Sequence, residues 1–304
     1  MPKRERVPLT TAQNYEVNNF KFKELYFTTI SPIFPNSAYL EWHNDNQDYV
    51  EDVFPIFSYD VYRSQSPHGP FVKLNSVPVT DEFYIDHTIQ QFSFERPYYF
   101  KITGTTTNLS SSFTVESNVD SLLADFRGLK RQRYLEHQKI KRDRRIQLSM
   151  VNAELYYLKK RRAGERCPDC YYEATRDKIV DKCETCYGAT FLDPYFNPIR
   201  ILVEYSQEQR NKNVTDKGYS EVTSFTVIMQ DVPRVSRDDF LFDPNNDRIY
   251  KIIGYQQTLL NKSPLTQILT ITELARDSIE YKIPIKDMPL TDLYPIVEEL
   301  KYVC

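Results

Sequence analysis

The chain of 304 residues is poor in several residue types, and each scarcity excludes a class of protein. No apolar run approaches the roughly 20 residues of a membrane-spanning helix, and the opening residues, MPKRERVPLTTAQ, lack the hydrophobic stretch of a signal peptide. We therefore expect a soluble protein with no membrane contact, made and used in a reducing cytoplasm. In that compartment cysteines serve as thiols or metal ligands rather than as disulfides.

Histidine and glycine are also scarce, with four and seven residues respectively. The phosphate-binding motifs GxxxxGK[ST] and GxGxxG are absent, and so is the nucleophile motif GxSxG. No histidine has a Ser or Cys partner nearby in a known catalytic order; the four are His43, His68, His87 and His137. The sequence therefore predicts that the protein is not an enzyme and has no small-molecule substrate.

Aromatic residues are abundant. Tyr (23) and Phe (18) raise the aromatic content to 14%, and apolar residues make up 40% of the chain, as in folded proteins. Aromatic side chains pack well on pleated surfaces, so this composition favours β-rich domains. A chain of this length is expected to form two or three of them.

Residues 20–118 are predicted to form an antiparallel β-sandwich. Three alternating segments, Ala38–Trp42, Phe57–Ser64 and Pro97–Gly104, have the pattern of short strands. Segments rich in Pro, Gly, Asp and Ser separate them, at the spacing of strands in a sandwich of about a hundred residues.

The same region carries a family resemblance. A strand ending in Trp42 is followed by YDVYRSQSPHGPFVKLN, FYIDHT and YYFKITG, and this order resembles the fibronectin type III domain. The resemblance implies that Trp42 fills the core, that VYRS and GPF form a hairpin and that the YYFKI strand carries the core tyrosine. Modules of this family mostly decorate and bind, so the resemblance implies no catalysis.

Residues 119–165 change character abruptly. They contain no Pro and many helix-forming residues, and apolar residues recur at helical spacing in two stripes. The stripes are Leu122, Phe126 and Leu129, and Met150, Val151, Leu155 and Leu158. We expect one long helix here, with Gly128 or Ser149 as the places where it would break.

This segment is also strongly basic. Ser121–Arg166 holds 14 Lys or Arg against 5 Asp or Glu, a local charge of +9, and because the whole chain carries −3 the rest carries −12. Such a helix can be a solvated face, a surface for an acidic neighbouring subunit or a nucleic-acid contact, and all three stay open. The cluster Lys139–Gln147 interleaves no aromatic residues, which favours backbone or protein contacts over base stacking. The candidate contact residues are Arg127, Lys130, Arg131, Arg133, Lys139, Lys141, Arg142, Arg144 and Arg145.

Residues 166–190 place four cysteines in two CxxC pairs, with 12 residues between the pairs. Two CxxC turns can complete a tetrahedron of thiolates about a zinc ion, and a redox pair is the weaker alternative. Four thiolates leave no open position for water, so the Zn²⁺ is predicted to be structural and to stabilise a knuckle too small for a core of its own. The predicted ligands are Cys167, Cys170, Cys183 and Cys186. The remaining cysteine, Cys304, is expected to be a free thiol.

Residues 191–285 again predict β-structure, and the acidic and apolar tail 286–304 is an expected docking segment. The predicted strands are Ile199–Tyr205, Ser224–Gln230, Arg248–Gln256 and Gln267–Leu274, with a turn at Asp243–Asp247.

A second resemblance rests on the basic helix, the knuckle and the strand after it. The residues that carry it are Cys167, Pro168, Cys170, Cys183, Cys186, Tyr187, Gly188 and Pro198. This arrangement is similar to neck, or head-to-tail connector, proteins of tailed bacteriophages. Val232–Thr258 looks like the small β-barrel domain of connector proteins. The expected fold is therefore mainly β with one long helical segment: an N-terminal fibronectin type III-like sandwich, a basic helix, a zinc knuckle and a C-terminal β-barrel-like domain.

The second resemblance implies a structural protein of the virion neck, synthesised in the host bacterial cytoplasm. About six or twelve copies would form a homo-oligomeric ring between the portal or adaptor and the tail proteins, around the channel for DNA. The basic helix would contact acidic neighbours or DNA. The ring interface would include Asp231, Arg234, Asp238, Asp239 and Arg248.

Two alternatives remain. One places the protein elsewhere in the virion, at the baseplate or the tail terminus. The other is a nucleic-acid-binding zinc-ribbon regulatory factor, which a strongly salt-dependent affinity for DNA would favour.

Overall fold

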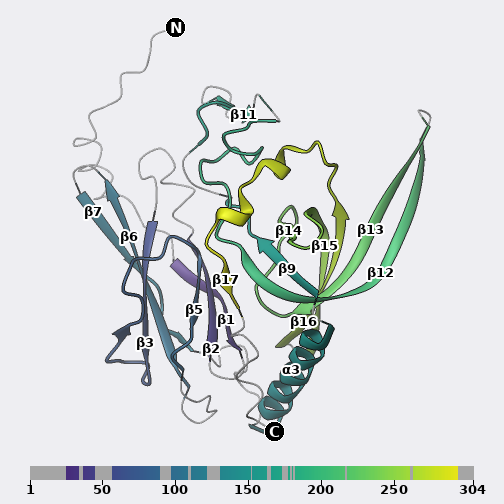
Figure 1. The fold of residues 1–304 in the computed structure, drawn as a ribbon. Helices are drawn as coiled ribbons and strands as arrows, with labels where there is room; N and C mark the ends of the chain where they lie inside the picture. The colour runs from purple at the N-terminus through teal and green to yellow at the C-terminus, as the bar shows by residue number, and fades with distance from the viewer. Residues whose placement is uncertain are drawn as a thin grey trace, which may run out of the picture.

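The computed structural model describes residues 25–33, 37–44, 57–89, 97–108, 111–121, 131–151, 153–162, 166–172, 177–178, 180, 182–215, 218–260 and 263–293. Two antiparallel sheets form the first domain (Figure 1). One has the order β1-β2-β5, with β1 at Leu25–Ile33, β2 at Ser37–Asn44 and β5 at Phe83–Asp86. The other has the order β4-β3-β6-β7, with β4 at Val72–Lys73, β3 at Phe57–Ser64, β6 at Tyr99–Asn108, β7 at Ser111–Glu116 and β8 (Asp120–Ser121) beside β6.

The two sheets enclose one apolar core, which confirms the predicted sandwich. Trp42 of β2 is fully buried, and its ring meets Tyr59 of β3 edge to face at 5.2 Å between centroids. The predicted hairpin is present, because Val72 and Lys73 pair with Arg63 and Tyr62. Residues 45–56, which connect β2 to β3, lie outside the described residues.

The predicted long helix is a shorter helix followed by a strand. Helix α3 spans Arg131–Val151, and strand β9 spans Ala153–Leu158. Leu155 and Leu158, which the sequence analysis assigned to a helical stripe, lie on β9 and are buried. The aromatic-rich AELYYL favours a strand, and the helix ends close to the break considered at Ser149.

The third region is a closed six-stranded barrel. Its strands are β12 (Ile199–Thr215), β13 (Gly218–Gln230), β14 (Phe240–Asp243), β15 (Arg248–Leu260), β16 (Ser263–Glu273) and β9. The sheet order β13-β16-β15-β14-β9-β12 closes through the pairing of β12 with β13. All four predicted strands of this region are confirmed, and the predicted turn at Asp243–Asp247 joins β14 to β15.

Strands β12 and β13 are longer than predicted. Their pairing continues out to Thr215 and Gly218, whereas the pairing of β13 with β16 stops at Ser224. The two strands therefore extend beyond the barrel as a two-stranded ribbon, shown in green in Figure 1. The sequence analysis missed this ribbon because its residues lack apolar alternation.

The chain from Ile279 returns to the outside of the barrel. Two short 3₁₀ helices, Ile279–Lys282 and Ile285–Asp287, precede strand β17 (Thr291–Asp292). Strand β17 pairs in parallel with the start of β12, and Leu293 is buried in the barrel core. The described part of the predicted docking tail thus packs on the chain's own barrel.

Candidate metal centre

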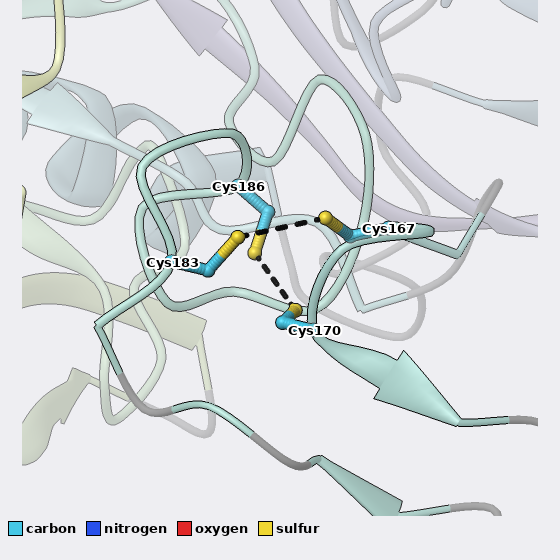
Figure 2. Close-up of side chains that lie close together, drawn as sticks. All are labelled: Cys167, Cys170, Cys183 and Cys186. Carbon is cyan, nitrogen blue, oxygen red and sulfur yellow. Dashed lines mark hydrogen bonds between the residues drawn. The ribbon is translucent and has the colours of Figure 1, made fainter.

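The four cysteines of the two CxxC pairs converge on one point (Figure 2). All four side chains are buried, and their sulfur atoms lie within 4.8 Å of one another. The Sγ atoms of Cys167 and Cys183 are 3.7 Å apart, and those of Cys170 and Cys186 are 3.3 Å apart. Zn–S bonds of about 2.3 Å in a tetrahedron require sulfurs about 3.8 Å apart. The two observed separations are slightly shorter than that distance, and all four sulfurs lie within 4.8 Å of one another, so the four residues fit a zinc ion.

Local backbone conformation forms this arrangement. Tyr187 and Gly188 both have positive φ, at 47° and 78°, which turns the chain sharply after Cys186. The N–H of Thr190 then donates to the sulfur of Cys186 at 3.4 Å. The N–H of Cys167 donates to the carbonyl of Thr190 at 2.9 Å and joins the two CxxC turns. A short hairpin of β10 (Tyr171–Tyr172) and β11 (Asp177–Lys178) separates the pairs.

The electrostatic environment differs between the two halves of the site. Burial raises the pKa of Cys167 and that of Cys170. Burial also acts to raise the pKa of Cys183, but the N–H groups of Cys186 and Thr185 donate to its sulfur and the net result is a pKa of about 7. Binding a metal requires thiolates, so it would release protons from Cys167 and Cys170.

The knuckle is fixed to the outside of the barrel. Tyr187 packs against an apolar cluster that includes Phe240 of β14 and Ile283 from the returning chain. Glu184 forms an ion pair with Lys282 of the first 3₁₀ helix. The candidate metal centre therefore lies in a module that packs against the outside of the barrel.

The predicted contact residues of the helix divide into two groups. Lys141 contacts Asp231 at 2.5 Å, Arg144 contacts Glu204 at 2.6 Å, and Arg145 is buried. These three cations serve contacts within the chain.

On the outer face of α3, Arg133 and Lys139 are exposed and Arg142 is partly exposed, beside exposed Glu136 and Asp143. This face carries mixed charge rather than a basic stripe. Arg127, Lys130 and the side chain of Arg131 lie outside the described residues.

The predicted ring-interface residues also fall into two groups, one buried and one accessible to solvent. Asp231 and Asp239 are buried within the chain, and the carboxylate of Asp239 accepts hydrogen bonds from the Tyr157 hydroxyl and two backbone N–H groups. Arg234 is partly buried, whereas Asp238 and Arg248 are exposed. Interface contact stays a prediction for these last three.

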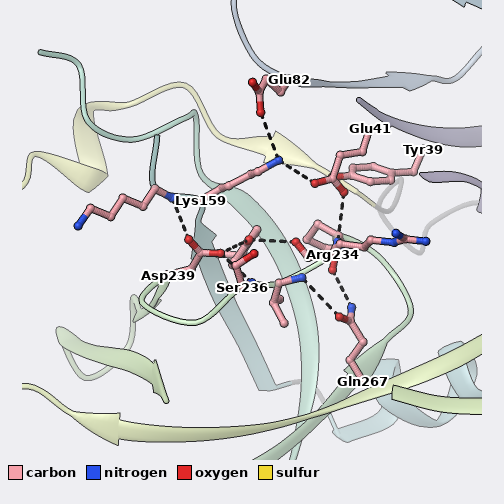
Figure 3. Close-up of polar contacts among 12 residues, drawn as sticks. Tyr39, Glu41, Glu82, Lys159, Arg234, Ser236, Asp239 and Gln267 are labelled. Atoms are coloured by element: carbon pink, nitrogen blue, oxygen red, sulfur yellow. Dashed lines mark hydrogen bonds and ion pairs between the residues drawn. The ribbon is translucent and has the colours of Figure 1, made fainter. Parts of the chain in front are cut away.

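A polar cluster between the first domain and the barrel was missed by the sequence analysis (Figure 3). Lys159, just after β9, contacts Glu41 at 2.7 Å and Glu82 at 3.7 Å, both in the first domain. Asn197 donates to Asp81 at 2.9 Å. Burial raises the pKa of Asp81 and of Glu82. Glu41 in the middle of a predicted strand was the available signal, since a carboxylate there needs solvent or a cation.

Among the helices that the structure describes, none is long and apolar enough to cross a membrane.

Comparisons with known proteins add little to this description. No protein-family model matches the chain, and no curated protein matches it. Among solved structures it is similar to module A71 of titin from human cardiac muscle, with 15% identity and a TM-score of 0.23. That similarity covers 32% of this chain and 85% of the titin module. The fold is therefore described from its own strands: a mainly β chain with one helix, an N-terminal sandwich, a four-cysteine cluster and a six-stranded barrel.

Proposed function

We propose that this protein is a structural subunit of a tailed-phage virion. About six or twelve copies form a ring in the neck, between the portal or adaptor and the tail, around the channel for DNA. The proposal combines the resemblance of the knuckle region to neck proteins with a fold in which the first domain and the barrel share an apolar core.

The observation that carries the proposal is the apolar core shared by the first domain and the barrel. Tyr39, Phe83 and Ile85 of the first domain belong to the same buried cluster as Val227 and Met229 of the barrel. Burying one such side chain contributes about 1.5–3 kcal/mol, so the two domains keep one orientation. A ring subunit needs fixed geometry, because closure depends on a constant angle between neighbours.

The metal has a structural part in this proposal. A Zn²⁺ held by four cysteines has no open position for water, so it would supply folding free energy rather than chemistry. It would hold the knuckle against the barrel wall at Phe240 and the returning chain at Ile283.

The outer face of α3 supports contact with protein rather than with DNA. Lys141 and Arg144 are occupied by Asp231 and Glu204, and the exposed face mixes both signs of charge. Counter-ion release from DNA requires several cations that are free to meet phosphates. The proposed partners of this face are neighbouring virion subunits.

Quantitative mass spectrometry of purified virus particles tests the proposal. The portal ring in the same particles serves as the internal standard for copy number. We expect about six or twelve copies of this chain per particle. Absence from the particle, with abundance in infected cells, would contradict a virion role and favour the nucleic-acid-binding factor.

A further inference from the structure

A cleft of about 350 Å³ lies between the first domain and the barrel. One wall comes from β1, β2 and Glu82, and the other from the segment after β9, the segment before β14 and Tyr255 of β15. Small-molecule and peptide side-chain sites typically have volumes of roughly 300–1,000 Å³. Two residues of the cleft, Arg234 and Asp239, are also predicted ring-interface residues, and Asp239 is buried within the chain.

The carboxylates in the walls already have hydrogen-bond donors. Glu41 accepts from the Nζ of Lys159 at 2.7 Å and from the hydroxyl of Tyr39 at 3.2 Å. Asp239 accepts from the hydroxyl of Tyr157 at 2.7 Å and from two backbone N–H groups. These acids therefore do not require a cation from outside the chain.

Several donors in the walls lack acceptors. The guanidinium of Arg234 makes no hydrogen bond or ion pair with any residue that the structure describes, and no contact is drawn to it in Figure 3. The exposed Arg162 donates once, to the carbonyl of Arg237 at 3.2 Å. Guanidinium N–H groups only donate, so the free donors of these two arginines select a ligand that accepts hydrogen bonds.

The charges and apolar surfaces of the cleft narrow the class of ligand. The lining has one net positive charge, which suits a single carboxylate better than a doubly charged phosphate; its four cations are Lys159, Lys160, Arg162 and Arg234, and its three acids are Glu41, Glu82 and Asp239. The ring of Tyr255, which is half exposed, offers apolar surface for a stem. We propose that the cleft binds an acidic side chain on an apolar stem, presented by a peptide segment of a partner protein. The proposal does not depend on the ring.

The test uses the full chain and isothermal titration calorimetry. Three probes are titrated: a blocked tetrapeptide of Leu and Glu, the same peptide with Gln in place of Glu, and inorganic phosphate. We expect a saturable heat of binding with the Glu peptide alone. Arg234→Gln and Arg162→Gln should each weaken its binding about tenfold, because each removes a charge-assisted hydrogen bond.

Arg248→Gln is the matched control, because Arg248 is exposed and pairs with Glu273 on the barrel, outside the cleft. It should leave the affinity unchanged. If Arg234→Gln fails to fold, the exposed Arg162→Gln keeps the test valid. The proposal is overturned by no saturable response at about 1 mM Glu peptide, by equal binding of the Gln peptide, or by unchanged affinity in both arginine variants. Preferential binding of phosphate would also overturn it, since it would assign the cleft to a phosphate ligand. Failure of the ring proposal would leave each of these outcomes unchanged.

Discussion

At the scale of single residues, the polar cluster around Lys159 holds an excess of buried negative charge. Lys159 has Glu41 at 2.7 Å and Glu82 at 3.7 Å, and both carboxylates are nearly inaccessible to solvent. Lys159 therefore makes ion-pair contact with both acids.

Replacing that cation should be costly. Lys159→Met removes the ion-pair contact that two buried carboxylates share, and we expect a loss of about 3–5 kcal/mol in the free energy of unfolding, measured by denaturant titration. Lys251→Met is the control, because Lys251 pairs with Asp238 at the surface. It should cost about 1 kcal/mol or less. Equal effects of the two substitutions would mean that the cluster does not link the domains.

Removing one of the two acids, Glu82, should not lower the free energy of unfolding at pH 7. Burial raises the pKa of Glu82, so the folded state favours its protonated form. The stability that this group contributes is present at low pH and is lost as the pH rises through the raised pKa. Glu82→Gln should therefore be at least as stable as the native chain at pH 7, with the difference shrinking toward pH 4. Thermal melting across this range checks the sign, and a variant that is less stable at pH 7 would refute it.

At the scale of elements, the fold of the knuckle is predicted to depend on a zinc ion. We expect one zinc ion per chain by elemental analysis and none in Cys186→Ser. Loss of zinc should lower the Tm by about 5 °C or more, because each kcal/mol shifts the Tm of larger domains by about 2–4 °C. Cys304→Ser is the matched control and should keep its zinc and its Tm. Zinc retained in Cys186→Ser would contradict the four-cysteine site.

The sequence was informative about elements wherever period and turn residues agreed. The strand Phe57–Ser64 was predicted with the bounds that it has, and the CxxC spacing identified all four clustered cysteines. The prediction for Leu155 and Leu158 was wrong, because apolar residues three positions apart fit a helical stripe as well as a strand that is buried on both faces. The outer parts of β12 and β13 were missed, because their sequences have no apolar alternation to detect.

At the scale of the whole molecule, the contact between the two domains could not be predicted. Ala38, Leu40 and Trp42 of β2 face the core of the sandwich, and the alternation of the strand predicts this. Tyr39 and Glu41 lie on the other face, which resembled a solvent face in the sequence. The structure buries both of them against the barrel. A strand's sequence gives its period, but it does not identify what covers its second face.

The central claim is the place of this subunit in the virion, and immunogold labelling of intact particles tests it most directly. An antibody against the first domain is applied to purified particles, which are then imaged by electron microscopy. The account predicts gold at the junction of head and tail. Gold at the distal end of the tail, or at any other position on the particle, would contradict it.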